Sequence, residues 1–180
     1  MDPTLIWKQI QKGNKNAFNQ LFKLFYPDLK AYGIKISGNE SVAIEAIQIL
    51  FVKIWEKRTT LNEVKAVKTY LIRAYRRTLL DFIQAEKKQN QLTLPIRIFQ
   101  ISPEELLLFH QEKAEQAKRL SELLNQLPEK QKEIIYLRFY NHLSYIEIAE
   151  IIDLNYQSVR NYGVKAIQFL RKNWEKSTDL

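Results

Sequence analysis

Apolar residues recur every three to four positions along most of the chain, which is the spacing that places them on one face of an α-helix. No segment sustains the alternation of apolar and polar residues that is typical of a strand. We therefore predict an all-α protein. In the first half, the segments with the helical pattern are 5–26, 28–36, 41–57 and 65–88, with Gly13-Asn14 and Gly38-Asn39 as breaks.

The helical pattern is lost after Glu86, where Gln, Asn and two prolines follow. It resumes at Ser102, a residue type that caps helices and is followed here by proline and two glutamates. We predict two small helical domains, 1–88 and 113–176, joined by a linker over 89–112. Part of the linker is expected to dock on a surface because it contains three large apolar residues, Ile96, Ile98 and Phe99.

Residues 144–172 predict a short helix, a tight turn and a longer helix. Ser144 and Glu147 have the spacing of a pair that caps a helix N-terminus reciprocally. Asp153 tolerates the left-handed turn conformation, and Asn155 is suited to cap the next helix. Such a helix-turn-helix places its second helix in the major groove of DNA.

The second helix of this pair has an apolar inner side and a largely polar outer side. Arg and Lys can bind guanine edges or phosphates, and Asn and Gln can bind adenine edges. An ordinary helical hairpin with a solvated basic face is the alternative, and the pattern alone leaves it open. The outer side carries Gln157, Arg160, Asn161, Val164, Lys165, Gln168, Arg171 and Lys172.

The segment 41–57 is the most apolar predicted helix, with apolar residues almost all around it. Such a helix is either buried on every side or covered by a partner. In a domain of this size, exposed apolar residues beside polar ones indicate a surface for a partner. The predicted surface consists of Glu45, Gln48, Ile49 and Val52.

The next predicted helix, 65–88, places basic residues on the arc opposite its apolar side. Together with Tyr75 and the loop before the helix, this arc is suited to follow the phosphates of a nucleic acid. A solvated basic helix face is the alternative, and the helix alone favours neither. The arc consists of Lys65, Arg73, Arg76 and Arg77.

Charge is distributed unevenly over the 180 residues, whose net charge is +8. Residues 1–90 hold 16 Lys and Arg against 8 Asp and Glu, while residues 91–180 hold 12 of each sign. Within the second half, the acidic stretch 101–153 precedes the basic segment 155–176. Two basic zones separated by an acidic one favour two contacts with a polyanion.

The chain has no cysteine and only two histidines, His110 and His142, so we expect no disulfide, metal site or cofactor. It shows no nucleophile–base arrangement and no phosphate-binding glycine loop, which argues against an enzyme. The N-terminus lacks a signal-peptide pattern, and no apolar run approaches the roughly 18 residues of a membrane span. We expect a soluble cytoplasmic protein without membrane insertion.

Two sets of short motifs lie in a fixed order along the chain. The first set includes Ala17-Phe18, Tyr26-Pro27, Glu45, Gln48, Phe51, Trp55, Tyr70-Leu71 and Arg73. The second set includes Leu127-Pro128-Glu129, Leu143-Ser144-Tyr145, Glu147-Ile148-Ala149-Glu150 and Val159-Arg160-Asn161. The first set is similar to region 2, and the second to region 4, of extracytoplasmic-function (ECF) sigma factors in the sigma-70 superfamily. The pair of regions is more specific than region 4 alone, which other helix-turn-helix proteins share.

The resemblance implies an alternative sigma factor that binds RNA polymerase core and directs promoter recognition and transcription initiation. Contact with the clamp of the beta-prime subunit would involve Glu45, Gln48, Ile49 and Val52. Opening and reading of the minus-ten element would involve residues 57–68, among them Lys65 and Lys68, together with Arg73, Arg76 and Arg77. Reading of the minus-thirty-five element would involve Gln157, Ser158, Arg160, Asn161 and Lys165. The linker would thread toward the polymerase active site, and an anti-sigma factor is the expected regulator.

The sequence departs from the family pattern at several positions. Ile49 stands where an acid is usual, so core binding is expected to rely more on apolar contact. Arg77 replaces a usual Asn, and Asp153 replaces a usual turn glycine. Gly163 replaces a common core Leu and costs about 1 kcal/mol of helix propensity relative to Ala. The helix at Gly163 therefore either packs unusually closely or bends easily.

Two other functions stay open from the residues alone. A stand-alone helix-turn-helix regulator, with a helical sensing or dimerisation domain, would bind duplex DNA without polymerase. An all-helical interaction module would use its basic faces only for solvation. The two basic zones around an acidic spacer, together with the apolar partner helix, favour the sigma-factor function.

Overall fold

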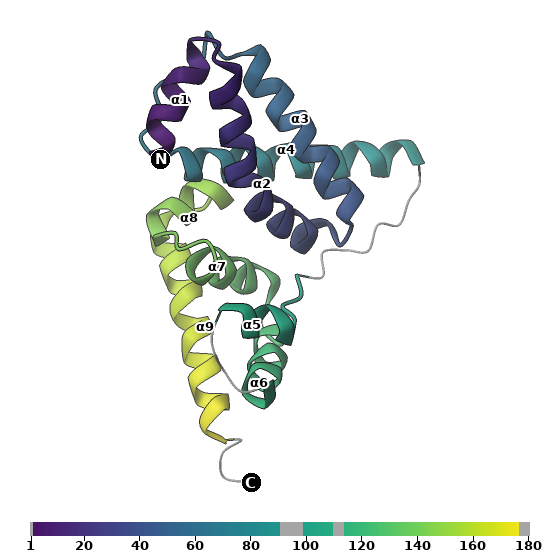
Figure 1. Ribbon diagram of the computed structural model, residues 1–180. Helices are drawn as coiled ribbons and strands as arrows, with labels where there is room; N and C mark the ends of the chain where they lie inside the picture. Colours follow the sequence, from purple (N-terminus) through teal and green to yellow (C-terminus); the bar gives the residue numbers. More distant parts are fainter. Residues whose placement is uncertain (1, 91–98, 110–113, 177–180) are drawn as a thin grey trace. The chain divides into compact units, whose positions relative to one another are not determined.

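The computed structural model describes residues 2–90, 99–109 and 114–176, and every regular element in these ranges is an α-helix (Figure 1). The chain divides into two compact units, residues 1–96 and 97–180. The predicted all-α class with two helical domains is therefore confirmed.

The first unit contains four helices, whose ends follow from the local sequence. Asn14 caps the second helix by accepting hydrogen bonds from the amides of Asn16 and Ala17. Gly38 ends that helix with a φ of 67°, a conformation that glycine adopts without steric cost. The helices are α1 (Pro3–Gln11), α2 (Lys15–Ser37), α3 (Glu40–Glu56) and α4 (Val67–Asn90).

The loop between α3 and α4 is fastened to α1. The indole N–H of Trp7 donates to the carbonyl of Asn62 at 3.1 Å, and the side-chain amide of Gln11 donates to the carbonyl of Leu61 at 2.7 Å. Trp7 itself is 1% exposed, so these bonds hold the loop at the edge of the core. Because α4 begins at Val67, Lys65 lies in this loop and not on the helix as predicted.

Tyr75 of α4 was predicted to lie along the exposed basic arc, and this prediction is wrong because the residue is completely buried. Its hydroxyl donates to the carbonyl of Ala43 on α3 at 2.9 Å, and burial raises the pKa of this hydroxyl. Gly33 on α2 makes room for the ring, because a Cβ there would lie 1.8 Å from the Tyr75 oxygen. Tyr75 therefore joins three helices and cannot contact a nucleic acid.

The second unit contains a helix that is buried on almost every side. This helix, α7 (Glu129–Phe139), buries Ile134 and Leu137 completely. It also buries Lys132, whose amino group lies 3.0 Å from the carboxylate of Glu129. Helix α7 packs against α9 (Tyr156–Lys176) and α8 (Tyr145–Ile152), while α6 (Ala114–Asn125) packs against α9 and α5 (Pro103–Phe109) packs against α6.

The last residues of the predicted linker pack within the second unit. The Phe99 amide donates to Glu129 at 3.1 Å, and its ring packs edge-on against Tyr136. The Ile101 amide donates to Asn125 at 3.0 Å. The predicted docking is thus confirmed for Phe99, which packs within its own chain. The path of the linker toward the polymerase active site stays a prediction. Ile96 and Ile98 lie outside the described residues.

Candidate nucleic-acid interface

Helices α8 and α9 and the turn between them have the geometry that their capping residues predict. The Ser144 hydroxyl accepts the Glu147 amide at 3.3 Å, and the Glu147 carboxylate accepts the Ser144 amide at 2.8 Å. Asp153 has a φ of 56°, in the left-handed region. Asn155 then accepts the Ser158 amide at 2.8 Å, which caps α9. The predicted helix-turn-helix is confirmed.

Gly163 allows α8 and α9 to approach closely. A Cβ on Gly163 would lie 2.6 Å from the hydroxyl oxygen of Tyr145 and 2.7 Å from its ring. On the same side of α9, Val159 and Ala166 are completely buried. Of the two explanations that the sequence leaves for this glycine, the structure supports close packing. The contact also fixes the angle at which α9 leaves the turn.

We expect Gly163→Ala to destabilise the second unit by about 1–2 kcal/mol, because the Tyr145 ring must move and this outweighs the better helix propensity of Ala. Thermal unfolding followed by circular dichroism measures the change. In a Tyr145→Ala background, the same substitution should cost nothing or stabilise. Stabilisation by Gly163→Ala alone would contradict this prediction, because it would show that the Tyr145 ring moves at no energetic cost.

The outer face of α9 is presented to solvent. Among the residues predicted to contact the minus-thirty-five element, Ser158 alone is half-buried, and it lies in the capped first turn of α9. The amide group of Gln157 donates to the side-chain oxygen of Asn161 at 3.4 Å, so these two side chains are aligned along the face. The exposed members of this face include Gln157, Arg160, Asn161, Val164 and Lys165. Their contact with DNA stays a prediction.

The predicted basic residues in and before α4 differ in how exposed they are. Arg73 and Arg77 are exposed, whereas Arg76 is half-buried. Lys65 is exposed in the loop before the helix. Lys68 lies toward α2, where its amino group is 3.2 Å from Asp28. The structure thus leaves Arg73 and Arg77 as the exposed cations on α4 itself among the five predicted residues.

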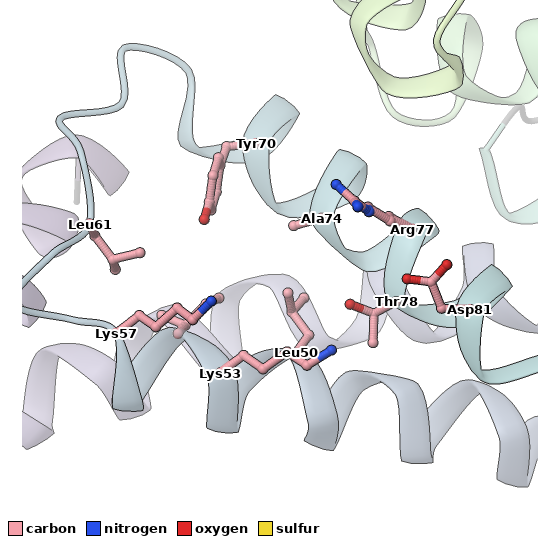
Figure 2. A pocket seen from close by; sticks show the side chains of 10 residues that line it. Leu50, Lys53, Lys57, Leu61, Tyr70, Ala74, Arg77, Thr78 and Asp81 are labelled. Atoms are coloured by element: carbon pink, nitrogen blue, oxygen red, sulfur yellow. The ribbon is translucent and has the colours of Figure 1, made fainter. Parts of the chain in front are cut away.

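A groove between α3 and α4 gathers further cations near Arg77 (Figure 2). It has a volume of about 430 Å³, and Tyr70 of α4 points across it toward α3. Lys53 and Lys57 extend from α3 into its lining, and Asp81 supplies a carboxylate. The residues predicted from the sequence to contact the minus-ten element did not include Lys53. Its four-residue spacing from Lys57 could have indicated it, because this spacing places both amines on one side of the helix.

The predicted partner surface of α3 is partly exposed. Val52 is 55% exposed, Glu45 and Gln48 are exposed, and Ile49 is half-buried. Beside it lies a cluster of aromatic rings from α2 and α3 with centroid separations from 4.9 to 5.7 Å. This aromatic cluster consists of Phe18, Phe22, Phe51 and Trp55. A rigid aromatic base beside exposed apolar atoms is typical of a protein-binding surface.

The described part of the chain contains neither a cluster of metal-binding side chains nor a membrane-spanning helix. Within it, no three His, Asp or Glu side chains gather closely enough to hold a metal ion. No described helix has the length and apolar character needed to cross a bilayer. The chemistry that these residues do offer is recognition through exposed cations, amides and apolar groups.

Two sequence families match the chain. The profile of Sigma-70 region 2 matches residues 21–89, and that of Sigma-70 region 4 matches residues 117–170. The chain is 29% identical to the RNA polymerase sigma factor SigV of Bacillus subtilis over 133 residues, which is 74% of this chain and 76% of the relative. It is 24% identical to the ECF RNA polymerase sigma factor SigW of the same organism over 177 residues, 92% of each chain.

Solved structures show the same fold. CnrH, in complex with the cytosolic domain of CnrY, superposes with a TM-score of 0.63 at 18% identity, over 97% of this chain and 99% of CnrH. The sigma factor RpoE of Bartonella quintana, in complex with the anti-sigma factor NepR, gives a TM-score of 0.62 at 21% identity, over 88% and 96%. The two matched regions together span more than half of the sequence. The chain therefore belongs to the sigma-70 family, as an ECF sigma factor that directs transcription initiation.

Proposed function

We propose that the second unit reads the minus-thirty-five promoter element, while the first unit binds RNA polymerase core and the minus-ten element. The outer face of α9 carries this proposal. Gln157, Arg160 and Asn161 are exposed in the first two turns of α9. The N-termini of both helices of the pair are capped, α9 by Asn155 and α8 by Ser144. A recognition helix contacts base edges with its N-terminal residues, and these side-chain types bind purine edges.

The α3–α4 groove supports the minus-ten assignment. Lys53, Lys57 and Arg77 line it, and Asp81 balances only part of their charge. Excess positive charge beside a concave surface attracts the phosphates of a nucleic acid strand. Tyr70, which points into the groove, offers an aromatic ring for stacking of a base. The groove thus adds Lys53 to the predicted site, which already included Lys57.

The exposed surface of α3 supports the polymerase assignment. Val52 presents apolar atoms, and Gln48 and Glu45 provide a polar rim. The same surface suits an anti-sigma factor, since one structurally similar sigma factor was solved with the anti-sigma factor NepR. An anti-sigma factor that bound this surface would compete with RNA polymerase core for it. The protein acts by binding, without catalysis of its own.

We expect the double substitution Ile49→Asp and Val52→Asp to release the protein from core polymerase without unfolding it. Two carboxylates at the centre of an apolar contact would have to be desolvated without partners, which is expected to weaken binding at least about 100-fold. Co-elution with purified core on gel filtration measures the loss. Leu5→Asp is the matched control, since Leu5 is 59% exposed on α1, and it should leave binding intact. Loss of the helical melt in the double variant would instead assign Ile49 and Val52 to the core.

Transcription in vitro tests the whole proposal. The components are the full-length protein, purified bacterial core polymerase and fragmented genomic DNA, and the RNA starts are sequenced. Starts that require the protein and share two short motifs at a fixed upstream distance are expected. Tight binding to duplex DNA without starts and without core binding would favour the stand-alone regulator.

A further inference from the structure

Val164 is an exposed apolar residue in the middle of the outer face of α9. Its side chain is 38% exposed. It follows Gln157 by seven residues, Arg160 by four and Asn161 by three. Residues at these spacings lie on the same face of a helix. Val164 is therefore surrounded by side chains that form hydrogen bonds.

The packing of its own unit does not explain this valine. The inner side of α9 packs through Val159 and Ala166, which are completely buried. Valine is a weaker helix former than Ala, Lys or Gln, and Val164 is not one of the buried residues whose packing would offset that cost. Single exposed apolar residues are common, so exposure alone indicates nothing. The position of Val164 among the exposed amide and guanidinium groups is the informative feature.

We propose that Val164 contacts the 5-methyl group of a thymine in the upstream promoter element. This inference rests on the proposed function of the second unit. In the major groove, thymine presents a methyl group that the other bases lack, and short apolar side chains bind it by excluding water. Val164 is the ninth residue of α9, within the half of the helix that meets the bases. It would add a preference for one A·T pair to the hydrogen bonds of its neighbours.

Replacement of thymine by deoxyuridine tests the contact because it removes only the methyl group. Each thymine of the upstream motif, on either strand, is replaced singly in the promoter found by the transcription assay. Occupancy by the holoenzyme with the full-length protein is then measured. At one position, deoxyuridine is expected to raise the Kd obtained from the occupancy about fourfold, the factor for loss of one buried methyl group. With Val164→Ala the same replacement should raise the Kd by less than about 1.5-fold, because the partner atoms are already gone.

Ile146→Ala is the matched control, since Ile146 is an exposed apolar residue on α8, at 61% exposure. This variant should keep the fourfold effect of deoxyuridine. Both variants change exposed side chains to a better helix former, so neither should melt at a lower temperature than the parent.

The inference and the proposed function fail in different ways. A deoxyuridine effect of equal size in the parent and in Val164→Ala overturns the inference, and so does a motif in which no thymine methyl group matters. In both cases, transcription from the promoter leaves the proposed function standing. Absence of protein-dependent starts overturns the proposed function and the inference together.

Discussion

Replacing Arg160 by glutamate is expected to reduce promoter-dependent transcription about 100-fold or more while binding to core polymerase is retained. Arg160 is exposed on the outer face of α9, five residues into the helix. Loss of a good bidentate contact to a base costs about 1–3 kcal/mol, and the new carboxylate is repelled by DNA phosphates. Run-off transcription from a mapped promoter measures the effect, and gel filtration with core measures the retained binding.

Arg171→Glu is the matched control for this experiment. Arg171 is also an exposed arginine of α9, but it lies three turns farther from the N-terminus of the helix. The N-terminal half of a recognition helix meets the bases, so Arg171→Glu should reduce transcription far less. Equal losses for both variants would indicate a general electrostatic attraction. Loss of core binding by Arg160→Glu would contradict the assignment of α9 to DNA.

A neutral substitution separates the two possible contacts of Arg160. If the guanidinium reads a base, Arg160→Gln should relax the preference at one position of the upstream motif. If it binds a phosphate, the same variant should weaken all promoters about equally and reduce the salt dependence of binding by about one charge. Sequencing of bound fragments from a randomised motif distinguishes these results.

Replacing Gly33 by alanine is expected to destabilise the first unit by about 3 kcal/mol, which lowers its melting temperature by about 15 °C. The added Cβ would lie 1.8 Å from the Tyr75 oxygen and 2.9 Å from the Cβ of Ala43. The Tyr75 ring must move, and its hydrogen bond to the Ala43 carbonyl is then lost inside the core. Differential scanning calorimetry of the full chain measures the change.

Gly13→Ala is the matched control because Gly13 also belongs to the first unit and has space around it. Its φ is +82°, and the nearest atom to an added Cβ is a side-chain nitrogen of Arg58 at 3.8 Å. Only the left-handed conformation opposes alanine there, at a cost of about 1 kcal/mol. A melting temperature for Gly33→Ala equal to that of Gly13→Ala would contradict the proposed steric role of Gly33.

The sequence alone determined the helices and the exposed outer face of α9. Apolar spacing and capping residues act over a few positions. The end of α2 at Gly38, the capped start of α8 at Ser144 and the exposed side of α9 therefore follow from local chemistry. The same local signal predicted the apolar surface of α3 around Val52, which is exposed in the structure. The motifs also identified the family.

Contacts between helices decided the rest, because they join residues that the sequence separates. Tyr75 is buried because α4 is packed by several neighbouring helices, and a helical pattern that assumes one apolar side places the residue on the surface. Lys68 is paired because Asp28 approaches it from α2, and Phe99 is buried because α7 offers Glu129 and Tyr136. The role of Gly163, which is to leave space for the Tyr145 ring, follows only from the position of that ring in the structure. Periodicity indicates which residues of a helix share a side, whereas only the tertiary structure shows what lies against each side.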